Sequence, residues 1–164
     1  MKYCIENRLD LFEFHDAEFA YISFENNNLS VSVRHLNIHK DAKENPHDYD
    51  MEIESATVSF RGVQVLSFEP MRAYKMGNDG NLYTDEPQII FKNVEAKARF
   101  TEELKKGITL NCIDIHPENE KTIIEIPVSA KNCFIVTFSF DSISVEWDAY
   151  CQKAWYEFRK VRRT

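Results

Sequence analysis

Apolar and polar residues alternate along most of the chain with a period of two, the spacing that is typical of β-strands. Residues 17–24 form an aromatic-rich run of this kind. Three asparagines follow at 26–28, and asparagine tolerates the left-handed backbone that tight turns require. Residues 29–38 then alternate again, with a leucine and two valines on one face. We therefore predict a β-hairpin over this region.

The same alternation predicts further strands along the rest of the chain. Within residues 51–60 the apolar positions change phase halfway, so a single flat strand would bury the wrong face. Gly62 is expected to form a bulge or turn after this stretch. Residues 95–106 have good helical composition, and Gly107 is a helix stop. The other predicted strands span residues 63–68, 88–94, 108–115, 123–128, 133–140 and 143–147.

About eight strands with turns at short spacing and one short helix predict a mainly β fold, an antiparallel sandwich or rolled sheet. Residues 39–50 and 77–87 are polar and rich in turn formers, so we expect exposed loops there. Neither loop is long enough to link separate cores, so residues 1–164 are expected to form a single domain. The last segment, 148–161, fits either a strand or one face of a helix.

The charge of the chain is acidic and unevenly distributed. Of 164 residues, 43% are hydrophobic and 29% are charged, which indicates a globular protein, and the formal net charge is −7. Residues 1–82 hold 8 Lys and Arg against 14 Asp and Glu. An acidic body argues against nucleic-acid binding, which depends on basic side chains, and suits a basic protein partner. The basic tail residues Arg159, Lys160, Arg162 and Arg163 are interpreted as a solvated end.

The chain has no apolar run of about 20 residues and no secretory signal, so we expect a cytoplasmic protein that does not enter the membrane. The four cysteines form no CxxC pair, which argues against a zinc ribbon or a thioredoxin-type site. Cys112 and Cys133 lie in apolar runs and are expected to be buried free thiols. Nucleophile elbows and phosphate-binding loops are absent as well. We therefore expect neither catalysis nor a cofactor.

Two sets of residues could nevertheless carry chemistry. His15 and Asp16 are adjacent, but neighbours on a strand point to opposite faces, so a local structural role for Asp16 is favoured over an acid–base pair. His35 and His39 could share one strand face and, with Asp48, hold the metal ion of a metal-dependent hydrolase, a further alternative. The sequence around Asp48 lacks the spacing of a calcium loop, so exposed loop residues are the preferred interpretation.

Aromatic residues are concentrated near the C-terminal end, where both tryptophans of the chain lie. Tryptophan and tyrosine are enriched in binding hot spots, but they also fill the core of β proteins. Two interpretations stay open, an interface and a core. The aromatic residues concerned are Trp147, Tyr150, Trp155, Tyr156 and Phe158.

Three segments of the sequence carry a resemblance to a protein group. These are FHDAEF at residues 14–19, the hairpin segment LSVSVRHLNI, and VEWDAYCQKAWYEF at residues 145–158. Together they resemble a group of small bacterial β-rich proteins, some of which are immunity proteins of polymorphic toxin systems. The resemblance implies a protein that neutralises a toxin by binding it. The matching positions are His15, Asp16, Trp147, Trp155 and Tyr156.

The hypothesis from the sequence is a non-catalytic binding protein, in its sharper form an inhibitor of a basic bacterial toxin. Loops carry function more often than strands, so the acids of the 39–50 loop are expected to contact the partner: Asp41, Glu44, Asp48 and Asp50. The alternative is a barrel that encloses a small apolar ligand. Its interior would be lined by Phe19, Tyr21, Phe138 and Trp147.

Overall fold

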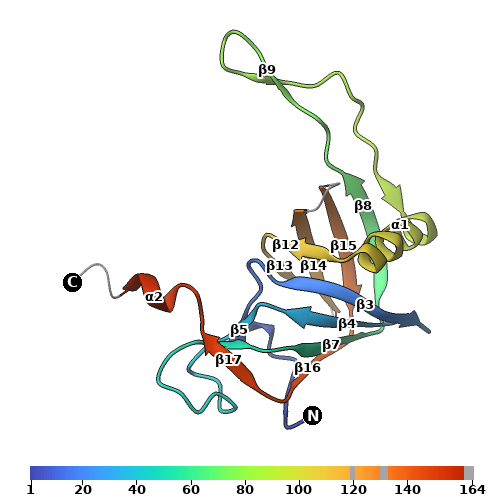
Figure 1. Ribbon diagram of the computed structural model, residues 1–164. Helices are drawn as coiled ribbons and strands as arrows, with labels where there is room; N and C mark the ends of the chain where they lie inside the picture. Colours follow the sequence, from blue (N-terminus) through green and yellow to red (C-terminus); the bar gives the residue numbers. More distant parts are fainter. Residues whose placement is uncertain (119–120, 130–132, 161–164) are drawn as a thin grey trace.

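The computed structural model describes residues 1–118, 121–129 and 133–160. The largest sheet of the described chain is an eleven-stranded antiparallel one, with the order β1-β16-β7-β4-β3-β12-β14-β15-β8-β11 and with β13 paired to β14 (Figure 1). Its strands are β1 (Tyr3–Glu6), β3 (Glu18–Glu25), β4 (Asn28–Arg34), β7 (Ala56–Arg61), β8 (Gln64–Pro70), β11 (Phe91–Lys92), β12 (Ile108–Leu110), β13 (Asp114–Glu118), β14 (Lys121–Ser129), β15 (Phe134–Phe140) and β16 (Ser142–Trp147).

Two smaller sheets lie beside it. A four-stranded sheet has the order β17-β6-β5-β2, and β9 and β10 form a two-stranded ribbon. Their strands are β2 (Phe12–Glu13), β5 (Leu36–Ile38), β6 (Met51–Ile53), β9 (Lys75–Met76), β10 (Leu82–Tyr83) and β17 (Tyr150–Lys153). The helices are η1 (Leu9–Leu11), α1 (Asn93–Lys106) and α2 (Glu157–Lys160). None of the described helices is long and apolar enough to cross a bilayer.

The large sheet is rolled around an aromatic core. Although β7 and β15 are far apart in the strand order, the ring of Phe60 on β7 lies 5.3 Å from the rings of both Phe138 and Phe140 on β15. Helix α1 packs across the roll, and its Phe100 stacks on Phe138 at 5.9 Å. The prediction of a mainly β, antiparallel sandwich or rolled sheet is therefore confirmed. The strands outnumber the eight expected because several are only two or three residues long.

The predicted hairpin is confirmed as β3 and β4, but its second strand ends at Arg34: His35 has a φ of 57°, and residues 36–38 form β5 in the four-stranded sheet. Asn26 and Asn27 at its turn have positive φ angles of 48° and 60°, the backbone that a two-residue turn of the primed type requires. The register pairs Phe24 with Leu29 and Phe19 with Val33, so the buried faces of the two strands coincide. A β-bulge between Tyr21 and Ser23 shifts the phase of β3, so that Phe19 and Phe24, which strict alternation would place on opposite faces, are both buried.

The stretch 51–60 is not one strand. It breaks at residues 54–55 into β6, which joins the four-stranded sheet, and β7, which joins the large sheet. The break explains the phase change, because each half buries its apolar residues against a different part of the core. Gly62 turns the chain into β8, as expected, with a φ of +67°.

Gly62 lies where a side chain would be doubly unfavourable. A Cβ atom there would stand 1.8 Å from Oδ2 of Asp141, whereas a Cβ on Gly80, whose φ is +79°, would meet nothing within 4 Å. Left-handed backbone costs a non-glycine residue about 1–2 kcal/mol. We expect Gly62→Ala to lower the free energy of unfolding by more than Gly80→Ala does, measured by urea denaturation. Equal losses would show that Asp141 yields without cost.

The remaining predictions have mixed outcomes. The expected helix is present as α1, and Gly107 ends it with a φ of +81°. The C-terminal segment contains both alternatives, strand β17 followed by helix α2. Cys112 and Cys133 are exposed rather than buried, so that prediction was wrong. Arg162 and Arg163 of the basic tail lie outside the described residues.

Candidate functional site

A row of polar side chains crosses one face of the four-stranded sheet. The register pairs Gln152 with Glu52, Glu52 with Asn37, and Asn37 with Glu13. Directly opposed residues of antiparallel strands share a face, so these four side chains, named here the polar row, lie side by side. The opposite face of the same strands joins the core through Phe12, Leu36, Ile38, Met51 and Ile53.

Glu52 is the centre of this row. It is 7% exposed, and both of its oxygens have partners. Oε1 lies 2.8 Å from Nδ1 of His35, and Oε2 accepts a 2.8 Å hydrogen bond from the side-chain amide of Gln152. Next to it, Asn37 is 1% exposed, and its Oδ1 has no hydrogen-bond partner in the described part of the chain.

Asp50 is a second buried carboxylate at the same end of the molecule. Its Oδ1 accepts a 2.7 Å hydrogen bond from the backbone N–H of Lys40. Its Oδ2 lies 3.2 Å from Nδ1 of His39 and accepts a 3.0 Å hydrogen bond from the Tyr156 hydroxyl. The backbone N–H of Ala154 donates to the Asp50 carbonyl. Asp50 therefore ties the C-terminal segment to the base of the 39–50 loop.

These contacts shift the ionisation of the groups involved. Burial alone raises the pKa of Asp50, but hydrogen bonds from Lys40, His39 and Tyr156 outweigh it and leave the pKa below its ordinary value. Burial also raises the pKa of Tyr156, and the hydrogen bond to Asp50 and the charge of Glu13 raise it further. The Tyr156 hydroxyl is consequently a donor at neutral pH, and Asp50 is an anion that accepts from it.

His15 and Asp16 lie beside the polar row, and they do interact. Asp16 has a positive φ of 66° and sits in a turn, so the rule that strand neighbours point apart does not apply. His15 Nε2 lies 3.6 Å from Asp16 Oδ2. The His15 backbone N–H donates to Glu13, and the His15 ring lies 5.9 Å from that of Trp155. The expectation that the two side chains stay apart was wrong.

The 39–50 loop extends the four-stranded sheet, and its acids differ in exposure. Asp41 and Asp48 are exposed, and Glu44 is half-buried. Asp50, expected in the exposed set, is only 9% exposed and holds structure instead. The loop has a defined shape, because the Tyr150 hydroxyl donates to the Glu44 carbonyl at 2.6 Å. The loop also borders a surface hollow whose lining includes Asp41, Glu44, Glu6 and Arg8.

Trp147 is not available to a partner. It is fully buried, and its ring stacks on Tyr3 at 5.3 Å and meets Phe12 edge-on at 6.1 Å. Of the two interpretations of the aromatic cluster, the core is correct for Trp147. Trp155 is 36% exposed and Tyr156 is half-buried, so both reach the surface beside the polar row.

The structure does not assemble the metal site that the histidines suggested. His35 and His39 pair with different carboxylates, Glu52 and Asp50, and Asp48 is not among their partners. Within residues 1–118, 121–129 and 133–160, no three His, Cys, Asp or Glu side chains are placed to hold a metal ion.

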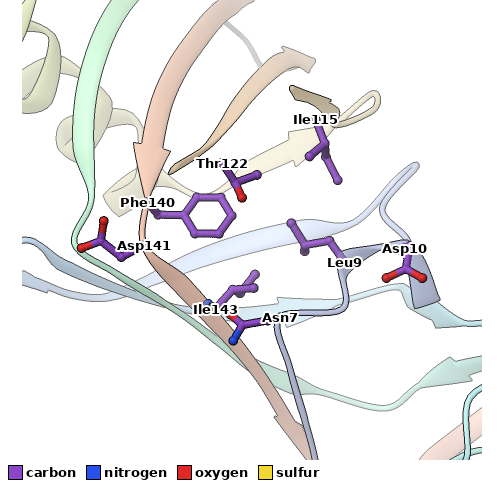
Figure 2. Close-up of a pocket in the computed structure, with 8 residues that line it drawn as sticks. All are labelled: Asn7, Leu9, Asp10, Ile115, Thr122, Phe140, Asp141 and Ile143. Atoms are coloured by element: carbon purple, nitrogen blue, oxygen red, sulfur yellow. Dashed lines mark hydrogen bonds between the residues drawn. The ribbon is translucent and has the colours of Figure 1, made fainter. Parts of the chain in front are cut away.

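Three of the four aromatic residues expected to line a ligand cavity fill the core instead, and the fourth, Tyr21, is half-buried against the core. Phe19, Phe138 and Trp147 are at most 2% exposed and pack against other rings. A hollow of about 300 Å³ does exist, but it opens at the surface between η1, β13 and β16 (Figure 2). Its lining is apolar at the centre and polar at the rim, and consists of Asn7, Leu9, Asp10, Ile115, Thr122, Phe140, Asp141 and Ile143.

Sequence reasoning placed most of the surrounding residues but missed the polar row itself. One signal was present: the triplets at 12–14, 36–38 and 51–53 read Phe-Glu-Phe, Leu-Asn-Ile and Met-Glu-Ile. Each has a polar residue between two apolar ones, and these triplets pair in the four-stranded sheet. Pairing of the triplets is a long-range property that alternation alone does not specify. No protein-family model, curated protein or solved structure matches this chain.

Proposed function

We propose that this chain is a non-catalytic binding protein that contacts a basic protein partner through its acidic end. The acidic end comprises residues 12–16, 36–53 and 150–156, which form the four-stranded sheet, its loop and the segment tied to it. These residues include seven Asp and Glu and three Lys. One observation carries the proposal: the fold brings two separate acidic segments, 12–16 and 36–53, together with the segment that carries the exposed Trp155.

The physical basis is electrostatic complementarity with an aromatic anchor. Exposed carboxylates at Asp41 and Asp48 attract a basic surface over a distance. Trp155, 36% exposed beside His15, has the size and position of an interface anchor. The buried Asp50 and Glu52 hold the C-terminal segment in place under this surface, because each accepts a hydrogen bond from a residue of that segment.

The sharper form of the proposal is an inhibitor of a basic bacterial toxin that acts in the cytoplasm. The resemblance to immunity-type proteins supports it, and His15, Asp16, Trp155 and Tyr156 of the matching positions all lie at the acidic end. An inhibitor must bind before its target acts, and an acidic surface that steers a basic partner increases the rate of association.

The test compares two triple variants with the same net charge. Asp41→Asn, Glu44→Gln and Asp48→Asn neutralise the acidic end, whereas Glu25→Gln, Asp85→Asn and Glu102→Gln neutralise exposed acids elsewhere. The partner is first identified by affinity capture with tagged protein at low and high salt, followed by mass spectrometry. Stopped-flow kinetics at low salt should then show association slowed about tenfold or more by the first variant, and much less by the second.

Three results would contradict the proposal or part of it. Equal slowing by both variants would mean that net charge matters and the acidic end does not. Capture of no protein, at either salt concentration, would remove the binding function itself. Association that does not depend on salt would remove the electrostatic part of the proposal, because steering between exposed charges is screened by ions.

The second candidate is a small-ligand binder, and the hollow in Figure 2 favours it. Leu9, Phe140 and Ile143 point toward its centre and offer an apolar floor. Its volume of about 300 Å³ is at the lower end of the range for small-molecule sites. Native mass spectrometry of the purified chain distinguishes the candidates, since a bound small molecule adds its mass to that of the protein.

A further inference from the structure

Residues 71–90 form an arm that projects from the end of the large sheet, beyond β8 and β11 (Figure 1). The arm carries a concentration of exposed large apolar side chains. They are Met71, Tyr74, Met76, Leu82, Tyr83, Ile89 and Ile90, with exposed fractions between 46% and 74%. Monomeric proteins rarely expose contiguous apolar patches of more than a few hundred Å².

The arm has a defined structure at its tip. Strands β9 and β10 pair Met76 with Leu82 and Lys75 with Tyr83. Asp79 accepts hydrogen bonds from the Tyr83 hydroxyl and from both the backbone and the side chain of Asn81. These bonds lower the pKa of Asp79 to about 2, so it stays an acceptor throughout the physiological range.

The base of the arm is also bonded. The side-chain amide of Gln88 donates to Glu69 at 2.7 Å, and the backbone N–H of Ala73 donates to Glu86 at 3.0 Å. The arm therefore presents its apolar side chains in a preformed arrangement, which lowers the entropy cost of binding through them.

The exposed area matches what a stable protein interface needs. A large apolar side chain has roughly 200 Å² of surface, so seven that are about half exposed present several hundred Å². A standard interface buries about 800 Å² on each partner. The apolar area of the arm alone thus approaches the area that one partner contributes to a standard interface, without any contribution from the body of the protein.

The charge of the arm permits a second copy of this chain as its occupant. The arm holds Arg72 and Lys75 against Asp79, Asp85 and Glu86, so it contributes little to the net charge of −7. It also projects away from the acidic end, at the opposite side of the molecule (Figure 1). Two chains that meet through their arms therefore keep their acidic ends apart. β11, next to the arm, is the last strand of the large sheet, and its outer edge has no strand partner among the described residues.

We infer that the arm is the contact through which two copies of this chain associate, with the apolar side chains of one arm packed against those of the other. This inference does not depend on the proposed function. A dimer of this form leaves both acidic ends exposed, so each copy can still bind a partner.

The test is the molar mass in solution. Analytical ultracentrifugation of the wild-type chain over a wide range of concentrations should show a mass that approaches twice that of one chain. The double variant Met76→Ser and Leu82→Ser changes two paired residues of the arm and should shift the dissociation constant at least tenfold toward the monomer. The matched control, Ile22→Ser and Val94→Ser, changes exposed apolar residues outside the arm and should dimerise as the wild type does.

Salt separates this inference from the proposed function. An apolar contact is retained or strengthened at high salt, whereas binding through the acidic end is weakened. A wild-type chain that stays monomeric at the highest concentration would overturn the inference, as would a double variant that dimerises as tightly as the wild type. Loss of the dimer at high salt would also overturn the inference. If the chain stays monomeric and its arm binds a different protein, that protein replaces the second copy as the occupant of the arm.

Discussion

Replacing Trp147 with alanine should lower the free energy of unfolding by about 3–5 kcal/mol, the range for removing a large aromatic side chain from a core. Trp147 is fully buried at 0% exposure, and its ring contacts Tyr3, Phe12 and Tyr150. The alanine variant leaves a cavity where the edge of the large sheet meets the four-stranded sheet. Urea denaturation at neutral pH measures the loss. Unfolding is monitored by far-UV circular dichroism, because the variant lacks one of the two tryptophans that fluorescence would report.

Trp155→Ala is the matched control, because it removes the other tryptophan of the chain from a position that is 36% exposed. It should cost much less stability, and it should weaken partner binding if Trp155 is an interface anchor. Equal losses of stability in the two variants would contradict the assignment of Trp147 to the core and of Trp155 to the surface.

Asp50→Asn should lower the free energy of unfolding by about 1.5–3 kcal/mol at neutral pH, the range for hydrogen bonds to a charged group. The buried carboxylate of Asp50 receives hydrogen bonds from Lys40 and Tyr156 and lies against His39. An amide is a weaker acceptor and places a donor against the N–H of Lys40 or the hydroxyl of Tyr156. The exposed Asp48→Asn in the same loop is the control and should change stability little.

The effect of Asp50→Asn should depend on pH in a defined direction. The folded-state pKa of Asp50 lies below its ordinary value, so the folded state favours the anion. The stabilisation is complete above the unfolded-state pKa of about 3.9 and is lost as the pH falls through the lower, folded-state pKa. The difference between wild type and variant should thus be constant near neutrality and shrink below about pH 4. A difference that grows in acid would show that Asp50 is not the stabilised anion.

Several features could be predicted from the sequence because they depend on neighbouring residues. The hairpin of β3 and β4 follows from alternation and from two asparagines with left-handed backbone. Helix α1 ends at Gly107, which adopts a positive φ. The mainly β class follows in the same way, since the period of two is a property of each segment alone.

The candidate site could be predicted only in part. The loop acids and the aromatic tail were found by composition, but Asp50 is buried and Trp147 is in the core. Burial depends on what the rest of the chain places over a residue. Asp50 is covered because Tyr156, more than a hundred residues later, returns to it. The sequence does not distinguish an exposed polar residue of a loop from a buried one that holds two segments together.

The sequence by itself determined the mainly β class, most of the longer strands, helix α1, the turn between β3 and β4 and the acidic character of the protein. Only the tertiary structure decided which strands share a sheet, and therefore which polar residues meet. The break at residues 54–55 sends β6 and β7 to different sheets, and this choice creates the polar row of Glu13, Asn37, Glu52 and Gln152. The physical reason is range: backbone preference is set within a few residues, whereas strand pairing minimises the exposed apolar surface of the whole chain.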